Sequence, residues 1–150
     1  MGQQQLLLLV LATIIVGIAT VVGIQAFSQN NVKSNADAMM NDAVRIASDA
    51  QAWAQKSAPF GGPTAANYGT FTGLTTLNQL GYQTDAEGDY VTLNGECSLD
   101  VSGDDPVISC VNDQLDNEVK VEITGLTDAG INGTVVRLGV AAATAPAGGG

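Results

Sequence analysis

The hydrophobic pattern of the chain begins with an apolar stretch at residues 6–24. This stretch carries no charged residue and no proline, and only two threonines and two glycines dilute its apolar side chains. An α-helix over these residues is roughly 28 Å long, which matches the hydrocarbon thickness of a bilayer. Because the stretch is apolar on every side, we expect it to lie in lipid or in an equally dry protein environment.

The apolar first part, residues 1–27, continues without a break into an amphipathic one, residues 28–58. No glycine or proline occurs from residue 27 to residue 58, so the sequence predicts one helix that runs to about Pro59. The apolar positions are spaced alternately by four and three residues, at Val32, Ala36, Met39, Ala43, Ile46, Ala50 and Trp53. Charged side chains occupy the opposite face, at Lys33, Asp37, Asp42, Arg45, Asp49 and Lys56. This half is therefore expected to bury one face against a folded head.

The rest of the chain predicts a small head that contains a sheet. Residues 59–88 connect helix and sheet, and three leucines before Gly81 predict a short helix with a glycine cap, at Leu74, Leu77 and Leu80. From residue 89 to residue 140 the period changes to two. This period predicts an antiparallel sheet with one buried face, built from strands at 90–93, 96–101, 107–111, 118–124 and 134–140. Residues 141–150 are low in complexity, and we expect them to be mobile.

Two cysteines, Cys97 and Cys110, change this picture by adding a covalent link. An even, local pair in a chain with an apolar N-terminal segment indicates an oxidising compartment and a disulfide. Counting inward from the turn at 102–106 places the two residues opposite each other in a hairpin. The predicted fold class is therefore α+β, a long N-terminal helix over about residues 1–58 packed on a small antiparallel sheet with one disulfide.

The charge of the chain limits its partners. The formal net charge is −10, only five residues are basic, and 12 of the 15 acids lie between Asp85 and Asp128. Binding to nucleic acid requires clusters of Lys and Arg that neutralise phosphates, so we expect no direct contact with nucleic acid. The same balance argues against an anionic membrane surface as a partner, and it is typical of a soluble, self-repelling exterior.

Catalytic and metal-binding patterns are absent from the sequence. The chain contains no histidine, no G-x-S-x-G elbow, no phosphate loop and no dinucleotide fingerprint, so we predict neither an enzyme nor a bound cofactor. Asp85, Glu87 and Asp89 are weak candidates for Ca²⁺, but they lack the spacing of an EF-hand and are typical of a solvated turn. Asn132-Gly133-Thr134 matches an N-glycosylation sequon, and the Asn-Gly pair is also a turn signal. We favour the turn.

Three interpretations of the apolar segment follow from its flanks. A cleaved secretory signal requires a basic n-region and a small-residue cleavage site, and residues 1–32 contain no Lys or Arg, so we expect the segment to be retained. A single-pass anchor usually carries Lys or Arg on its cytoplasmic side, and none precedes the segment here. The third interpretation is an assembly helix that leaves the membrane and becomes the core of a polymer.

The layout of residues 1–58, an apolar helix that continues into an amphipathic half ahead of a β-sheet head, resembles that of the type IV pilin superfamily. Pilin precursors are cut after a glycine, and the mature chain usually has a methylated first residue, a Glu at its fifth position and a hydrophobic sixth residue. If Met1 is the mature first residue, Gln5 stands in place of that Glu and Leu6 follows correctly. If Gly2 ends a short leader, Gln3 becomes the first residue. We prefer the first register because it aligns the step from polar to apolar residues.

This resemblance implies a structural subunit of an extracellular filament. The subunit would sit in the inner membrane, pass to a pilus assembly machinery and polymerise with itself through its apolar helix. The candidate assembly residues are Met1, Gln5, Leu6, Leu9, Ile14, Gly17, Val21, Ile24 and Phe27. Gln5 cannot neutralise the α-amino group of a neighbouring copy as a Glu would, which leaves a pseudopilin of a secretion system as an alternative. A membrane-anchored binding domain that does not polymerise is a second alternative.

The glycines of the apolar segment lead to one more prediction. Glycine in a helix interior is less favourable than alanine by about 1 kcal/mol. We therefore expect a break or a stretch in the helix around Gly17 and Gly23.

Overall fold

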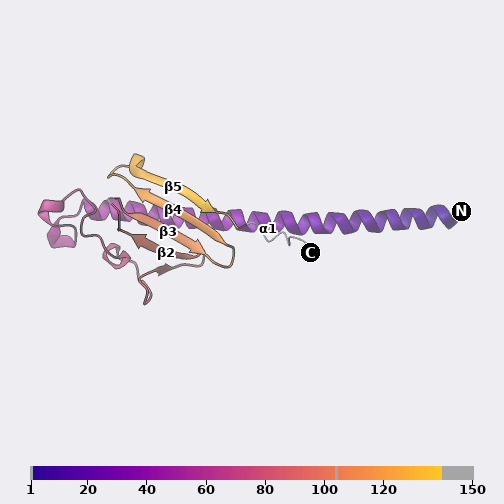
Figure 1. The fold of residues 1–150 in the computed structure, drawn as a ribbon, viewed down its shortest axis with the longest axis horizontal. Coiled ribbons are helices and arrows are strands. Elements are labelled where there is room, and N and C mark those ends of the chain that lie inside the picture. Colours follow the sequence, from indigo (N-terminus) through magenta and orange to yellow (C-terminus); the bar gives the residue numbers. More distant parts are fainter. Residues whose placement is uncertain (1, 104, 140–150) are drawn as a thin grey trace, which may run out of the picture.

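The computed structural model describes residues 2–103 and 105–139. One helix, α1 (Gly2–Ala54), runs from its N-terminal end into a head, where a sheet covers its second half (Figure 1). Four features considered above lie outside the described residues. They are Met1, position 104 in the turn at 102–106, the end of the last predicted strand at 140, and the tail at 141–150.

The predicted break in α1 is wrong, because the helix is continuous through Gly17 and Gly23. The glycine penalty of about 1 kcal/mol per residue is small. Opening a turn would leave backbone N–H and C=O groups unpaired, which in an apolar environment costs several kcal/mol for each group. Continuous hydrogen bonding is therefore the more stable arrangement.

The helix ends at Ala54, earlier than the predicted end near residue 58. The Ala54 carbonyl accepts a hydrogen bond from the Gly69 N–H at 3.0 Å, and the Trp53 indole N–H donates to the Gly61 carbonyl at 2.8 Å. Gly62 lies so close to the Lys56 backbone that no side chain would fit there. The connection thus folds back on the last helical turn and replaces the next turn of helix.

The connection contains three short 3₁₀ helices, η1 (Ala58–Phe60), η2 (Ala65–Asn67) and η3 (Leu77–Leu80). The short helix expected before Gly81 is therefore present as a single 3₁₀ turn. Thr76 and Gln79 form a capping box at its start, and Gly81 ends it in the left-handed conformation, with φ of 94°.

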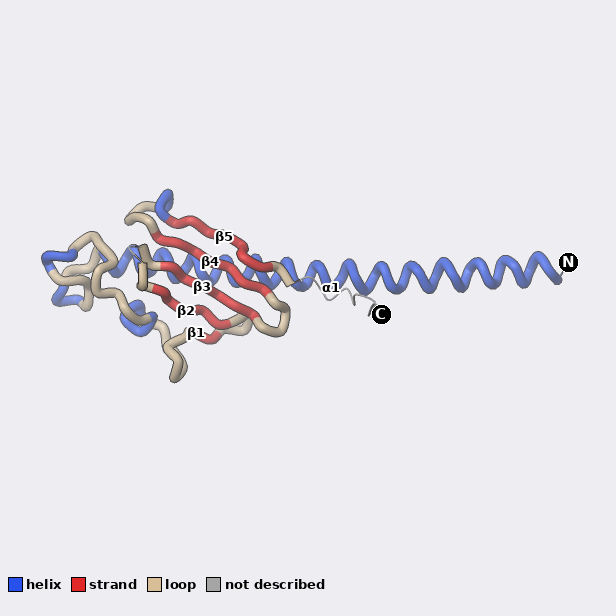
Figure 2. The backbone as a smooth tube through the Cα atoms, in the orientation of Figure 1, coloured by secondary structure: helices blue, strands red, loops and turns tan. Residues whose placement is uncertain are grey.

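The sheet has five strands in the order β1-β2-β3-β4-β5, and all neighbours are antiparallel (Figure 2). The strands are β1 (Tyr90–Val91), β2 (Glu96–Asp100), β3 (Val107–Asn112), β4 (Asn117–Ile123) and β5 (Ile131–Arg137). Each predicted strand has a counterpart, although β1 is shorter than expected. Cys97 and Cys110 pair across β2 and β3 and form the predicted disulfide.

The turn interpretation of Asn132-Gly133 is wrong, because both residues lie in β5 and pair with β4. Strand β5 begins at Ile131, three residues before the predicted start, and the reversal is made upstream, where η4 (Asp128–Gly130) precedes the strand. A Cβ atom at position 133 would lie 2.8 Å from the Met40 sulfur. Gly133 therefore lies in the strand against the Met40 side chain of α1 and does not form a turn.

The core lies between the second half of α1 and one face of the sheet. Every member of the predicted apolar stripe is buried: Val32, Ala36, Met39, Ala43, Ile46, Ala50 and Trp53. The sheet contributes alternate residues of β4, namely Val119, Val121 and Ile123, together with the disulfide. The predicted α+β fold class is confirmed.

Candidate functional site

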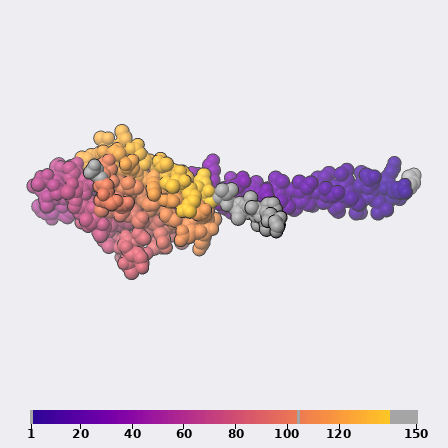
Figure 3. All heavy atoms as spheres, viewed as in Figure 1, coloured from indigo at the N-terminus to yellow at the C-terminus, as the bar shows by residue number. Residues whose placement is uncertain are grey.

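The first half of α1 projects from the head as a narrow rod (Figure 3). All residues from 2 to 27 are exposed, and the large apolar side chains among them expose between 49% and 72% of their surface. By length and composition, α1 is a helix that could cross a membrane. This exposed apolar segment, residues 2–27, is the candidate functional site.

The predicted assembly residues within the described chain all lie on this segment: Gln5, Leu6, Leu9, Ile14, Gly17, Val21, Ile24 and Phe27. No part of the head covers them, since each is exposed. At Gly17 and Gly23, no atom lies within 4 Å of where a Cβ would be, so the helix surface there is open to a neighbour. The structure therefore places these residues on one segment but assigns them no contact partner.

The polar side chains in the middle of the segment satisfy their own hydrogen bonds. The Thr13 hydroxyl donates to the Val10 carbonyl at 2.8 Å, and the Thr20 hydroxyl donates to the carbonyls of Val16 and Gly17 at 2.9 and 2.8 Å. A hydroxyl that is bonded to its own helix avoids most of the penalty of entering an apolar medium. These two threonines are thus compatible with a dry environment.

Small side chains gather on one side of the segment, and larger ones dominate the opposite side, a feature that helical periodicity reveals but that was not among the sequence predictions. Val21 and Ile14 precede the buried Val32 by 11 and 18 residues, spacings that return to the same helix face. The large side therefore continues the face that packs on the sheet. The opposite side carries small residues, at Ala12, Ala19, Gly23 and Ala26.

One of the polar contacts between the second half of α1 and the head involves a tyrosine. The Tyr82 hydroxyl donates a hydrogen bond to Asp49 Oδ2, and the Arg45 guanidinium lies 5.9 Å from the centroid of its ring. Burial raises the pKa of Tyr82 well above its ordinary value, and the hydrogen bond to Asp49 raises this pKa further. The phenol therefore stays protonated and holds the loop against the helix.

The weak calcium candidates have another role in the structure. Asp85 Oδ1 accepts hydrogen bonds from the backbone N–H groups of Glu87, Gly88 and Asp89, at 3.1, 3.0 and 2.9 Å. This carboxylate stabilises its own turn. Among the described residues, no group of three or more His, Cys, Asp or Glu side chains is arranged to hold a metal ion.

The candidate site therefore consists of an exposed apolar rod, whose large side continues the face buried in the head and whose small side faces away from the sheet. Comparisons of this chain with protein-family models, with curated proteins and with solved structures find no match.

Proposed function

We propose that the chain is a structural subunit of an extracellular filament of the type IV pilus kind. In this proposal, residues 2–27 hold the subunit in the membrane and then pack against the same segment of other copies. The observation that carries the proposal is the division of one unbroken helix: its second half is the core of the head, and its first half is apolar and entirely exposed.

The size of the exposed apolar surface excludes water as its final environment. Fourteen large apolar side chains between Leu6 and Phe27 are exposed. Burial of such a side chain contributes about 1.5–3 kcal/mol, so covering them all is worth on the order of 20 kcal/mol or more. Such a free energy requires either lipid or a second protein surface around the segment.

The small side of the segment supports the step from lipid to polymer. Lipid tails are as apolar as leucine, so the hydrophobic effect does not by itself draw helices together in a membrane. Close packing at small residues does, and Ala12, Ala19, Gly23 and Ala26 line the side that faces away from the sheet. Copies packed through this side would carry their heads outward.

Gln5 favours a second candidate within the same superfamily. Its amide is able to accept a hydrogen bond from an α-amino group but cannot cancel its charge, and an unpaired ammonium is costly to bury. A short pseudopilin assembly of a secretion system buries fewer such groups than a long fibre does. The assembly machinery, the inner membrane and other copies of the chain are the partners in both cases.

Electron microscopy of material sheared from the cell surface, with mass spectrometry of its N-terminal peptide, tests the proposal. We expect fibres that contain this chain with a methylated Met1 or Gln3. Short assemblies confined to the envelope would favour the pseudopilin. A chain found only as a detergent-extracted monomer would overturn both proposals and leave a membrane-anchored binding domain.

A further inference from the structure

The surface through which α1 packs on the sheet repeats every seven residues. Larger buried side chains recur at this interval, at Val32, Met39, Ile46 and Trp53, and an alanine follows each of the first three by four residues, at Ala36, Ala43 and Ala50. A slide of the helix by seven residues toward the C-terminal end, roughly 10 Å along its axis, would place apolar residues again at the five positions from Met39 to Trp53, and Gln25 and Gln29 at the places of Val32 and Ala36. The apolar surface from Met39 to Trp53 alone therefore discriminates weakly between these registers.

Two buried amides lie at opposite ends of this interface. Among the described residues, Gln51 and Asn117 are the buried polar side chains, with 6% and 0% of their surface exposed. Gln51 Nε2, on the helix, donates to the carbonyls of Gly125 and Thr127 on the sheet side, at 2.7 and 2.9 Å.

Asn117, on β4, makes the reciprocal contact from the sheet to the helix. Its Nδ2 donates to the Val32 carbonyl and to Asn35 Oδ1, both at 2.9 Å, while its Oδ1 accepts from the Gly139 N–H at 2.9 Å. Each amide therefore joins two elements that are far apart in the sequence.

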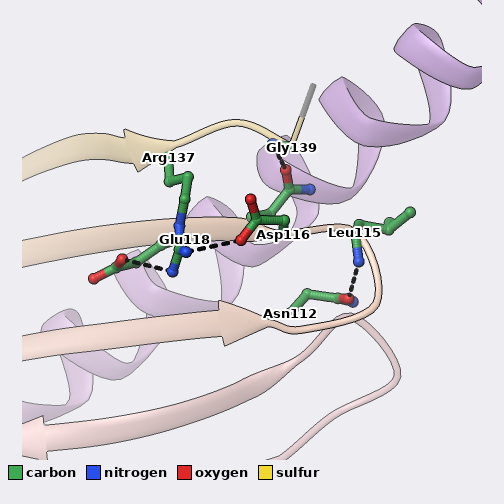
Figure 4. Close-up of polar contacts among 7 residues, drawn as sticks. Asn112, Leu115, Asp116, Glu118, Arg137 and Gly139 are labelled. Atoms are coloured by element: carbon green, nitrogen blue, oxygen red, sulfur yellow. Dashed lines mark hydrogen bonds and ion pairs between the residues drawn. The ribbon is translucent and has the colours of Figure 1, made fainter. Parts of the chain in front are cut away.

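Contacts of the neighbouring residues hold the start of β4, where Asn117 lies, in place (Figure 4). Arg137 bridges Asp116 and Glu118, at 2.8 and 3.2 Å, on either side of Asn117. Gly139 lies so close to the Leu115 carbonyl that no side chain would fit there. Asn117 is thus presented to α1 from a fixed position at the end of the β3–β4 hairpin.

The amides do not follow the seven-residue repeat. After a slide by seven residues toward the C-terminal end, Val44 would stand in place of Gln51, and Ser28 would stand in place of Asn35. The carbonyls of Gly125 and Thr127 would then face an apolar side chain and lose their donor. An unsatisfied buried carbonyl is unfavourable, so the amides oppose the slipped register, which the apolar positions from Met39 to Trp53 do not.

We infer that Gln51 and Asn117 are positioning residues that set the register of α1 on the sheet. They thereby determine how much apolar helix projects beyond the head. That the projecting length matters for filament geometry rests on the proposed function, whereas the register itself does not.

Spin-label distances in detergent micelles test the inference on the full chain. Labels at Ser34→Cys and Ala129→Cys occupy exposed positions near opposite ends of the interface, so their separation reports axial sliding. We expect one distance in the parent protein and in either Gln51→Leu or Asn117→Leu, because one amide remains. The double variant is expected to add a second population, shorter by roughly 10 Å. A double variant that keeps only the parent distance would overturn the inference.

A relocation variant carries the test by itself if the double variant does not fold. Val44→Gln with Gln51→Val, in the Asn117→Leu background, moves the helix amide by seven residues and should make the shorter distance dominant. An unchanged distance would contradict the inference. Asn112→Leu is the matched control, since Asn112 donates to the Asn94 carbonyl at 2.6 Å and makes no hydrogen bond to α1. This control variant should leave the distance between the two labels unchanged. Because the distance is measured in micelles, it reports the register even if the proposed filaments do not form.

Discussion

At the scale of single residues, the phenol of Tyr82 links the protonation state of the protein to its stability. The folded chain holds the Tyr82 proton more tightly than the unfolded chain, because burial and the Asp49 carboxylate both raise its pKa. The contribution of this group to stability is fully present below about pH 10, the unfolded pKa of a tyrosine. Above that pH the unfolded chain releases the proton and the folded chain keeps it, so the free energy of unfolding falls as pH rises.

Tyr82→Phe should flatten this alkaline loss of stability. The variant loses the hydrogen bond to Asp49, which lowers the free energy of unfolding at pH 7 by about 1 kcal/mol, but it no longer titrates. Urea denaturation between pH 8 and pH 12 measures the slope. Tyr68→Phe, at a position that is 60% exposed, is the matched control. Equal slopes in parent and Tyr82→Phe would contradict the role assigned to this phenol.

At the scale of elements, the disulfide joins the neighbouring strands β2 and β3 within the core. Cys97 and Cys110 are separated by 13 residues, and closing such a loop stabilises the folded state by about 3 kcal/mol in the chain-entropy model. Cys97→Ala with Cys110→Ala should lower the free energy of unfolding by about that amount in urea denaturation. Addition of a reductant should lower the free energy of unfolding of the parent and leave that of the variant unchanged. Equal free energies of unfolding for the two proteins without reductant would contradict the expected contribution of the disulfide.

The apolar half of α1 allows a prediction that separates insertion from assembly. Gly23→Leu keeps the segment apolar, so membrane insertion should be retained, but it fills the small side of the helix surface and should abolish the proposed filaments. Ile14→Leu, on the large side of the segment, is the control. Membrane fractionation and electron microscopy measure the two properties. Normal filaments from Gly23→Leu would mean that no helix packs closely at this site.

The sequence predicts elements well where local periodicity and burial agree. The stripe from Val32 to Trp53 and the alternation in β4 are regular because each faces a single core, so both were predicted correctly. The end of α1 at Ala54 was not, since it depends on the bond from Trp53 to Gly61, a contact between elements that spacing does not encode. The prediction of a turn at Gly133 was wrong for the same reason, because this residue lies against Met40, which is far away in the sequence.

At the candidate site too, features that depend on local sequence could be predicted, and contacts between distant residues could not. Exposure of residues 2–27 follows from composition, since nothing in a head of this size could cover a segment that is apolar on all sides. The buried amides could not be predicted, because Asn and Gln are mostly exposed and neither Gln51 nor Asn117 belongs to a motif. Their role depends on which carbonyls they meet after folding.

At the scale of the whole molecule, charge and hydrophobicity are separated. Within residues 1–56, three basic residues balance three acidic ones, so the net charge of −10 lies entirely in the remainder, which has 12 acids and two basic residues. Neighbouring heads in a filament would therefore repel one another. In the proposed filament, this repulsion would act against the packing of the apolar segments.

Filament stability should consequently rise with ionic strength. The screening length falls from about 30 Å at 0.01 M salt to about 8 Å at 0.15 M, which weakens repulsion between heads. Sedimentation of sheared filaments at the two salt concentrations measures the fraction that remains assembled. Asp113→Asn with Asp128→Asn, at exposed positions, should reduce the salt dependence. Filaments that dissociate as salt is added would contradict this balance of forces.

The outline of the molecule has one more consequence. A broad, water-soluble head on a thin apolar rod has the shape of a surfactant with a large headgroup and a single slender tail (Figure 3). Amphiphiles of this shape do not tile flat layers, because tails that touch force the wider headgroups to splay apart. They gather around a point or a line, so the proposed cluster of these chains would curve into a closed bundle with its tails inside, without any further contact between the heads.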